Sequence, residues 1–279
     1  MRIITTVAKM QEQALLWRQE GRVIGFVPTM GYLHEGHTSL LNTARRECDK
    51  VVLSIFVNPT QFGPNEDFSV YPRNACRDIR IAKTAGVDAV FFPTEKEMYP
   101  RGYATYVYVK ELEKKLCGQT RPIHFQGVAT IVTKLFQITQ PHYAYFGQKD
   151  AQQAILLRRM VDDLNIPLIM RVMPIVREAD GLAMSSRNAY LSVDERKQAL
   201  VLSSALKFFQ EQVKKGETSV QKLRKQMEDV IATAPAARID YIAFVDTKTL
   251  EPFEEIKEGT LVALAVYIGK TRLIDNWMI

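Results

Sequence analysis

The stretch RVIGFVPTMGYLHEGHTSLL, residues 22–41, joins an apolar run to a turn that holds glycine and two histidines. The run at 22–29 carries β-branched and aromatic residues, which is typical of a strand buried on both faces. Apolar residues at helical spacing follow at 37–48. A strand that leads through a turn into a helix is the first half of the unit from which parallel sheets are wound.

The same alternation of strand and helix continues along the chain. Further strand-like runs lie at 50–58, 88–93, 142–147 and 166–176, and the amphipathic segments between them lie at 73–85, 131–138 and 150–164. Alternating strands and helices are typical of an α/β domain with a parallel sheet. We therefore predict a Rossmann-like N-terminal domain over residues 1–176.

The pattern changes after residue 176. Two amphipathic helices are predicted at 193–216 and 219–233, and three strand-like runs follow at 238–246, 260–269 and 271–276. These last runs lie close enough in sequence for an antiparallel meander. We therefore predict a smaller α+β domain over residues 177–279, made of helices and a short antiparallel sheet.

Composition excludes several classes of protein. The 279 residues are 47% apolar and 24% charged, as in a globular protein, and no run reaches the ~18–20 apolar residues of a membrane helix. The N-terminus MRIITTVAKMQEQ lacks the apolar segment of a secretory signal, so we expect a cytoplasmic protein without a membrane partner. The three cysteines show no CxxC spacing, which argues against a disulfide framework and a zinc site.

The net charge of +6 is compatible with two kinds of partner. Nucleic-acid binding is typical of basic residues that cluster on one face or in a dense run. Here the basic residues are scattered, and the densest groups, KLRK and LLRRM, resemble ordinary helix surfaces. We therefore expect a small anionic substrate and no nucleic acid.

The turn after the first apolar run is a candidate phosphate site. Parallel sheets bind ligands beyond the carboxyl ends of their strands, where the N-terminus of a helix offers amide donors. A phosphate there would meet the amides of Met30 and Gly31 and the imidazoles of His34 and His37. Gly36 would let the backbone approach closely. The alternative is a solvated turn that happens to contain two histidines.

Two later segments offer further donors to phosphate. The segment GLAMSSRNAYLS places Ser185, Ser186 and Arg187 just beyond a predicted strand, and arginine can bind phosphate oxygens bidentately. In YFGQKDAQQ, Lys149 follows a strand that ends at the same edge of the sheet. The alternatives are two helix-capping serines with a surface arginine, and Asp150 as a plain helix cap.

The loop SIFVNPTQFGPNEDFSVYPR, residues 54–73, follows the second strand. Its amides Asn58 and Gln61 can donate to a carboxylate and accept from a hydroxyl group. The NED sequence at 65–67 is a weak metal signal because no histidine or further carboxylate accompanies it. We predict no metal ligand from the protein, and only a buried or capping role for His124.

Several motifs occur in a fixed order between residues 3 and 276: PTMGYLHEGH, SIFVNPTQFGPNEDF, YPR, HFQGV, YFGQKDAQQ, VREADGLAMSSRNAYLS and RLIDN. In this combination the chain resembles the pantoate–β-alanine ligase family, within the HxGH nucleotidyl-transferase superfamily that also includes class I aminoacyl-tRNA synthetases. The resemblance implies an ATP-dependent acid–amine ligase of pantothenate and coenzyme A biosynthesis. In the family's reaction, (R)-pantoate attacks the α-phosphorus of ATP to give pantoyl adenylate and pyrophosphate. The amine of β-alanine then releases pantothenate and AMP.

The resemblance also implies roles for individual residues. His37 matches the proposed proton donor, and His34 would contact phosphate beside it. Gln61 matches an amide that contacts pantoate and later β-alanine, and Gln153 matches the second pantoate amide. The set implied to bind ATP is Met30, Gly31, Tyr32, Leu33, His34, Glu35, Gly36, His37, Gly147, Gln148, Lys149, Asp150, Val176, Met184, Ser185, Ser186 and Arg187.

Further expectations come from the same resemblance. Mg²⁺ would be carried on the ATP phosphates, the C-terminal domain would act as a lid, and the chain would form a homodimer through its N-terminal domain. Tyr32, Thr38 and Gln126 depart from the family's usual residues. Thr38 places a hydroxyl group on a helix face that we expect to be buried.

Three other functions stay open at this point. A class I aminoacyl-tRNA synthetase would need a tRNA-binding domain, for which the ~100 residues after the boundary leave little room. A nucleotide-forming adenylyltransferase would lack the paired glutamines and the FVNPTQFGPNEDF loop. A basic RNA-binding protein without activity would show salt-dependent affinity for RNA.

Overall fold

The computed structural model describes residues 1–64 and 66–279, so Asn65 of the NED sequence lies outside the described residues. Contacts within the chain divide it into two compact units. Unit 1 comprises Met1–Gly147 and Leu156–Pro174, and unit 2 comprises Gln148–Ile155 and Ile175–Ile279. The predicted roles on either side of residue 176, a catalytic domain and a lid, stay predictions.

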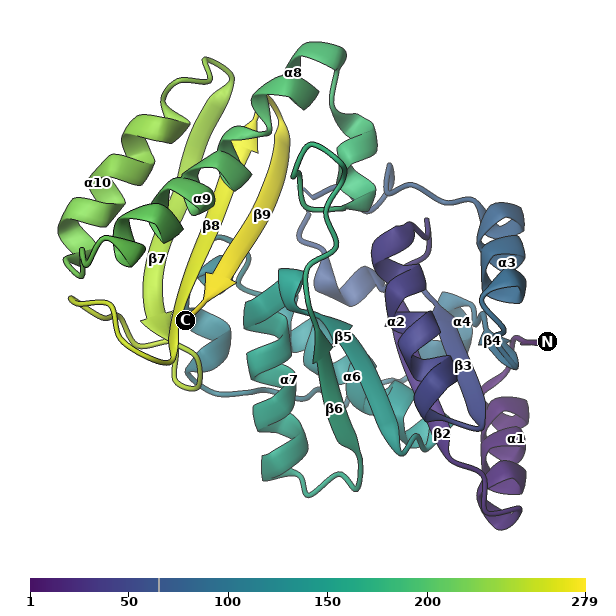
Figure 1. Cartoon of the computed structure of the whole chain (residues 1–279). Helices are drawn as coiled ribbons and strands as arrows, with labels where there is room; N and C mark the ends of the chain where they lie inside the picture. Colours follow the sequence, from purple (N-terminus) through teal and green to yellow (C-terminus); the bar gives the residue numbers. More distant parts are fainter. Residues whose placement is uncertain (65) are drawn as a thin grey trace. The chain divides into compact units, whose positions relative to one another are not determined.

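Unit 1 is built on a six-stranded sheet in which every pairing is parallel. This confirms the predicted Rossmann-like α/β fold. From β2 the chain adds β3 and β4 on one side and later places β5 and β6 on the other, so the strand order reverses between β2 and β5 (Figure 1). Open sheets bind ligands at the carboxyl ends of their strands at such a point. In spatial order the strands are β1 (Arg2–Ile4), β4 (Ala89–Phe91), β3 (Lys50–Ile55), β2 (Ile24–Thr29), β5 (Tyr143–Gly147) and β6 (Ile169–Met173).

Helices cover both faces of this sheet, because consecutive strand residues point to opposite faces. Val27 of β2 joins a buried apolar cluster with residues of α2 (Glu35–Glu47) and α3 (Ala75–Thr84). Its neighbour Phe26 meets Phe136 of α6 (His124–Thr139) edge to face, with 6.3 Å between the ring centroids. α1 (Val7–Gln19) packs against α6. Each such buried side chain contributes about 1.5–3 kcal/mol, so β2 is firmly held from both sides. The short helices of this unit are α4 (Glu95–Met98) and α5 (Cys117–Thr120).

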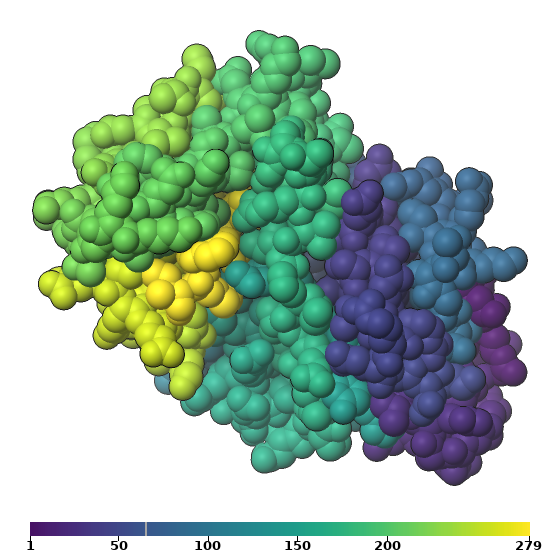
Figure 2. All heavy atoms as spheres, in the orientation of Figure 1, coloured from purple at the N-terminus to yellow at the C-terminus, as the bar shows by residue number. Residues whose placement is uncertain are grey.

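Unit 2 contains an antiparallel sheet of β7 (Ala237–Asp246), β8 (Thr260–Ile268) and β9 (Thr271–Met278), which confirms the predicted meander. α9 (Val201–Lys214) and α10 (Val220–Ile231) pack on this sheet through an apolar cluster that includes Phe209, Leu223 and Phe244. In Figure 2 the green atoms of these helices cover much of the sheet, and yellow atoms of the C-terminal strand remain visible beside them. The unit also holds the 3₁₀ turn Gln148–Asp150 and the first residues of α7 (Ala151–Asp163).

Two predicted helices differ from the structure. The helix predicted at 193–216 is two helices, α8 (Val193–Gln198) and α9. Between them the amide of Leu200 donates to the carbonyl of Lys197, which is the tighter i→i+3 bond of a 3₁₀ turn. α6 begins at His124 and not at residue 131, since the polar first turn conceals its start. No helix in the described parts of the chain is long and apolar enough to cross a membrane.

Candidate active site

The carboxyl end of β2 leads into the loop that carries two histidines. Thr29 ends the strand, and Gly31 and Tyr32 follow with φ angles of 84° and 49°. A positive φ is unfavourable for tyrosine, so this turn needs support from outside the loop. A Cβ atom on Gly31 would lie 3.0 Å from Ile55 Cγ2 and 3.1 Å from Asp78 Oδ2. Glycine therefore meets both the φ angle and the close approach.

Asp78 of α3 supplies that support. Its side chain is 2% exposed and accepts hydrogen bonds from the Tyr32 amide (2.7 Å) and the Leu33 amide (2.8 Å). The guanidinium of Arg77 lies 5.2 Å from the ring centroid of Tyr32. Hydrogen bonds to a carboxylate are roughly twice as strong as neutral ones, so Asp78 fixes the left-handed turn. Asp78 was not among the residues predicted from the sequence.

His34 and His37 cap one another at the start of α2. His34 is the N-cap residue, and its Nδ1 accepts a hydrogen bond from the Gly36 amide at 3.2 Å. His37 Nδ1 accepts from the His34 amide, also at 3.2 Å, and the ring centroids are 4.1 Å apart. A neutral imidazole that accepts at Nδ1 carries its proton on Nε2. Both rings are therefore held in the tautomer that donates from Nε2.

The amide of Gly31, which was expected together with that of Met30 to bind phosphate, has a partner within unit 1, and so do the next two amides of the loop. The Gly31 amide donates to Thr29 Oγ1 at 3.2 Å. The amides of Tyr32 and Leu33 donate to Asp78. Phosphate binding through these amides would require them to exchange hydrogen bonds.

The departures from the family's usual residues are accommodated locally. Thr38 is half-buried, and its hydroxyl donates to the carbonyl of His34 at 3.2 Å. A threonine hydroxyl can be satisfied in this way inside a helix, which answers the expected packing conflict. Gln126 Nε2 donates to the Tyr108 hydroxyl at 2.8 Å.

Gln61 lies in the 3₁₀ turn Pro59–Gln61 that follows β3, and it is 7% exposed. Its Oε1 accepts from Asn58 Nδ2 at 3.2 Å, and its Nε2 donates to Met30 Sδ at 3.0 Å. The structure thus brings the predicted substrate amide to Met30, which is itself predicted to contact ATP. A thioether is a weak acceptor, so a substrate oxygen can replace it.

The backbone of Gln61 is held by the first residue of α6 and by Arg121, which precedes that helix. His124 Nδ1 lies 2.9 Å from the Gln61 carbonyl oxygen, and Arg121 Nη2 lies 3.5 Å from the same atom. Arg121 also pairs with Glu66 at 2.5 Å. His124 is half-buried, as expected, but it also contacts the candidate substrate-binding residue. The HFQGV motif was the signal for this position.

Tyr99 supports the amide of Asn58. Its hydroxyl donates to Asn58 Oδ1 at 2.8 Å and lies 3.1 Å from Thr60 Oγ1. Burial raises the pKa of Tyr99 from 10.0 to about 12. Lys134 lies 5.7 Å from the ring centroid, and burial lowers the pKa of this lysine. The phenol therefore stays protonated and remains a donor.

We expect Tyr99→Phe to reduce the loss of stability at alkaline pH. Because the pKa of Tyr99 is raised in the folded state, the unfolded chain releases its phenol proton first. The free energy of unfolding therefore falls as the pH rises from 10.0 to about 12. Since Tyr99 is only partly buried, this loss is about 1–2 kcal/mol. Urea unfolding across this pH range measures it.

Tyr108→Phe is the control for losing a phenol, because Tyr108 is 62% exposed. Its alkaline loss of stability should match that of the wild type. Equal losses in the wild type and in Tyr99→Phe would contradict the role of Tyr99 burial.

In unit 2, Lys149 lies in the 3₁₀ turn that precedes α7. Asn276 Nδ2 donates to the carbonyl oxygens of Gln148 and Lys149, at 2.9 Å each. Asp150 is exposed at the end of the turn, and Gln153 is half-buried in the first turn of α7. Asn276 therefore holds the backbone of the turn, and this backbone sets the direction in which the Lys149 side chain leaves it.

The serine and arginine segment begins a second 3₁₀ turn, Ser186–Tyr190. Ser185 is its N-cap residue, and Ser185 Oγ accepts from the Arg187 amide at 3.2 Å. The capping role is thus present, and it fixes the segment that the phosphate hypothesis requires. The Met184 amide donates to the Val176 carbonyl at 3.0 Å, so the structure pairs these two predicted ATP contacts.

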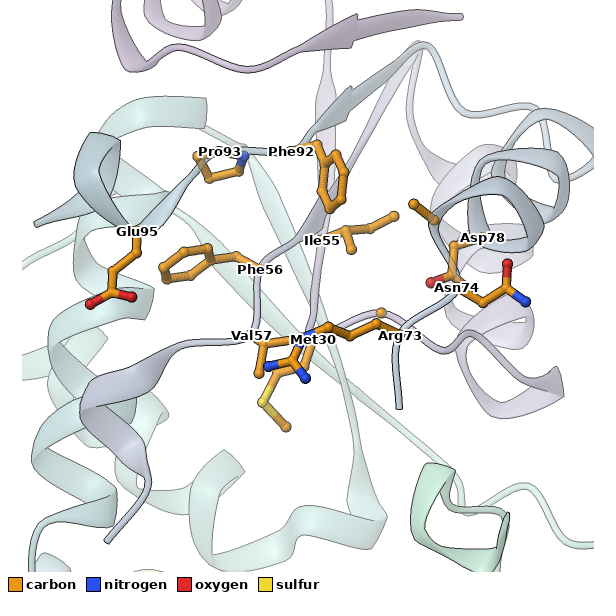
Figure 3. Close-up of a pocket in the computed structure, with 12 residues that line it drawn as sticks. Met30, Ile55, Phe56, Val57, Arg73, Asn74, Asp78, Phe92, Pro93 and Glu95 are labelled. Atoms are coloured by element: carbon orange, nitrogen blue, oxygen red, sulfur yellow. The ribbon is translucent and has the colours of Figure 1, made fainter. Parts of the chain in front are cut away.

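A cavity of about 230 Å³ opens beyond the carboxyl ends of β3 and β4 (Figure 3). Phe56, Val57 and Phe92 make its wall mostly apolar, and Met30 also lines it. Of the residues predicted to bind substrates, Met30 and Gly31 line this cavity, and Gln61 does not. The cavity therefore borders the predicted site without containing it.

The parallel sheet, with two donor histidines beyond its central strand, defines an α/β enzyme of the HxGH nucleotidyl-transferase type. The chain belongs to the pantoate-β-alanine ligase family, whose model matches residues 2–278. It is therefore a ligase, as the sequence motifs predict.

Relatives of known name support this assignment. The chain is 58% identical to the pantothenate synthetase of Acetivibrio thermocellus over 276 residues, which cover 99% of this chain and 98% of that one. It is 54% identical over 279 residues to that of Heliobacterium modesticaldum, covering 100% of this chain and 99% of that one.

Solved structures confirm the fold. The crystal structure of pantothenate synthetase from Thermus thermophilus is similar, with a TM-score of 0.94, 46% identity and 99% coverage of each chain. The pantoate-β-alanine ligase from Francisella tularensis, complexed with β-γ ATP and β-alanine, has a TM-score of 0.82 and 36% identity. That similarity covers 100% of this chain and 97% of the other.

Proposed function

We propose that the chain condenses (R)-pantoate with β-alanine in two steps at the expense of ATP. The pantoate carboxylate attacks the α-phosphorus, which gives pantoyl adenylate and pyrophosphate. The β-alanine amine then attacks the acyl carbon, which gives pantothenate and AMP. The observation that carries this proposal is the pair of mutually capping histidines, which present Nε2–H donors beyond the central strand of the sheet.

The first step places new charge on the non-bridging oxygens of the α-phosphate and on the departing pyrophosphate. His37 donates a hydrogen bond from Nε2–H to the departing pyrophosphate, and His34 binds phosphate from the neighbouring position. Because the imidazoles are fixed by backbone amides, they need little reorganisation as the charge develops. The reaction needs positioned donors and no protein nucleophile.

Gln61 binds pantoate, and later β-alanine, with its side-chain amide. An amide suits both substrates, because its NH₂ group donates to a carboxylate and its oxygen accepts from a hydroxyl or an amine. In the structure its Nε2 donates to the weak acceptor Met30 Sδ, a bond that a carboxylate oxygen can replace at low cost. Gln153 of unit 2 is the second pantoate amide in this proposal.

The ATP contacts in this proposal are Met30–His37, Gly147–Asp150, Val176 and Met184–Arg187. Lys149 and Arg187 provide the positive charge that a triphosphate requires. The β-γ ATP and β-alanine bound by the Francisella tularensis relative support ATP and β-alanine as substrates.

Magnesium, the oligomeric state and the location complete the proposal. In residues 1–64 and 66–279, no group of three or more His, Cys, Asp or Glu side chains could hold a metal ion. We therefore assign Mg²⁺ to the substrate, as the complex with ATP, since this ion prefers phosphate oxygens and water. A homodimer that forms through the N-terminal domain, a C-terminal lid and a cytoplasmic location belong to the same proposal.

A pyrophosphate-release assay with each substrate omitted in turn tests the function. With ATP, pantoate and β-alanine present, we expect continuous formation of AMP and pyrophosphate. Without β-alanine, we expect one burst of pyrophosphate per active site, because the adenylate stays bound. Without pantoate, we expect none. Turnover that continues undiminished without pantoate would reject the proposal.

A further inference from the structure

The RLIDN motif at residues 272–276 ends in two buried polar side chains. Asp275 and Asn276 are each 2% exposed. They are neighbours on β9, so the two side chains leave the strand toward opposite faces. Burying a carboxylate and an amide costs free energy unless both find partners. Asn276 binds the turn at 148–150 that the proposed function assigns to ATP, and Asp275 binds Arg177, between the assigned residues Val176 and Met184.

Asn276 is bound to the turn that carries Lys149. Its Nδ2 donates to the carbonyls of Gln148 and Lys149 at 2.9 Å each, and its Oδ1 accepts from Gln148 Nε2 at 3.3 Å. The amide thus bridges two consecutive peptide groups just before α7. These bonds set the direction in which the backbone presents Lys149.

Asp275 is bound to the start of the segment that carries the serines. Its two carboxylate oxygens accept from Arg177 Nη1 at 2.6 Å and Nη2 at 2.9 Å, a bidentate pair. Arg177 Nη1 also donates to the carbonyl of Gly181 at 3.0 Å, and Arg177 forms an antiparallel bridge with Ala183. Asp275 therefore closes the hairpin that leads directly into Ser185.

The two side chains are also linked to each other. Asp275 Oδ1 accepts a hydrogen bond from the backbone amide of Asn276 at 2.8 Å. A displacement of one segment is therefore transmitted to the other through a single peptide of β9. Since charge-assisted and bidentate bonds are the stiffest available, this link is short and rigid.

We infer that Asp275 and Asn276 are positioning residues that set the spacing of Lys149 and of Ser185–Arg187 for one triphosphate. This inference rests on the proposed function, because it takes both segments to be ATP contacts. Neither side chain touches substrate in this scheme. Their role is to keep a fixed distance between two proposed phosphate-binding segments that lie far apart in the sequence.

Kinetics of Asn276→Ala test the inference. The variant loses three hydrogen bonds to the turn, so we expect the KM for ATP to rise about tenfold. The KM for β-alanine, which Gln61 binds in the proposal, should stay within about twofold of the wild-type value. Asn276→Asp should raise the KM for ATP further, because its oxygens would face the two carbonyl oxygens.

Leu273→Ala is the matched control for stability. Leu273 lies on the same strand, is 5% exposed and belongs to the apolar cluster of unit 2. It should lower the thermal midpoint at least as much as Asn276→Ala and leave the KM for ATP unchanged. Hydrogen exchange at residues 148–152 should speed up in Asn276→Ala more than in Leu273→Ala.

The outcomes separate this inference from the proposed function. A wild-type protein that fails to use ATP with pantoate contradicts the proposed function, and the inference falls with it. A wild type with the expected turnover, together with an unchanged KM for ATP in Asn276→Ala, contradicts the inference alone. An equal rise in the KM for ATP in Leu273→Ala would reduce Asn276 to a merely structural role.

Discussion

Replacing His37 by alanine should slow adenylate formation about 10²–10³-fold and change the KM for pantoate by less than about threefold. The Nε2–H group of His37 faces charge that appears only as pyrophosphate departs, so its contact is strongest in the transition state. Rapid-quench measurement of pyrophosphate release, with β-alanine omitted and pantoate varied, reports the chemical step and the binding of pantoate separately.

The control must account for the structural role of the ring, because His37 Nδ1 also accepts from the His34 amide. Ser39→Ala serves this purpose, since the Ser39 hydroxyl donates to the Gly36 carbonyl at 2.8 Å in the same turn of α2. It should lower stability by no more than about 1 kcal/mol, as loss of an ordinary side-chain hydrogen bond does, and leave the chemical step intact. Equal losses of rate and of pantoate affinity in His37→Ala would contradict the proposal that His37 Nε2–H donates to the departing pyrophosphate.

Asp78→Asn should give the second large effect, a fall of about 10²-fold in kcat/KM for ATP. The carboxylate accepts from two consecutive amides at the left-handed turn, and an asparagine presents one oxygen and one NH₂ group to the same two donors. One amide is then left facing another donor. The turn relaxes, and His34 and His37 lose their fixed place. We also expect a loss of about 2–4 kcal/mol in the free energy of unfolding.

Asp49→Asn is the matched control for this prediction. Asp49 Oδ2 also accepts from a backbone amide, that of Val23, at 2.8 Å, but near the start of β2. The control should keep the wild-type kcat/KM for ATP. Steady-state kinetics measure kcat/KM for ATP in the two variants, and urea unfolding measures their free energies of unfolding. If Asp78→Asn loses stability without losing kcat/KM, Asp78 supports the fold and not the loop's function.

The parts of the fold that could be predicted are those that a short stretch of sequence indicates by itself. The apolar runs of β2 to β5 stand out because strands buried on both faces carry few polar residues. Those of β6 to β9 are also apolar in sequence, although β6 is exposed or half-buried throughout. α1 was missed because it exposes Leu15 and Leu16 and buries Gln13, which weakens its periodicity. β1 was missed because it is an edge strand of three residues.

The same distinction holds for the candidate site. The histidine loop, the glutamines and the serine segment are contiguous motifs, and a resemblance to a family assigns them directly. Asp78 and Asn276 bind backbone atoms 46 and 128 residues away, and a local sequence pattern cannot predict contacts over such separations. The mutual capping of His34 and His37 was also hidden, because histidine is an unusual residue at both positions of a helix cap.

The division of α7 limits how this protein can be recombined with its relatives. The helix is continuous from Ala151 to Asp163, yet residues up to Ile155 belong to unit 2 and those from Leu156 belong to unit 1. A fragment that ends at Pro174 keeps the turn at 148–150 and loses the asparagine that holds it. A working chimaera of two such enzymes therefore has to take residues 148–155 and 175–279 from the same parent.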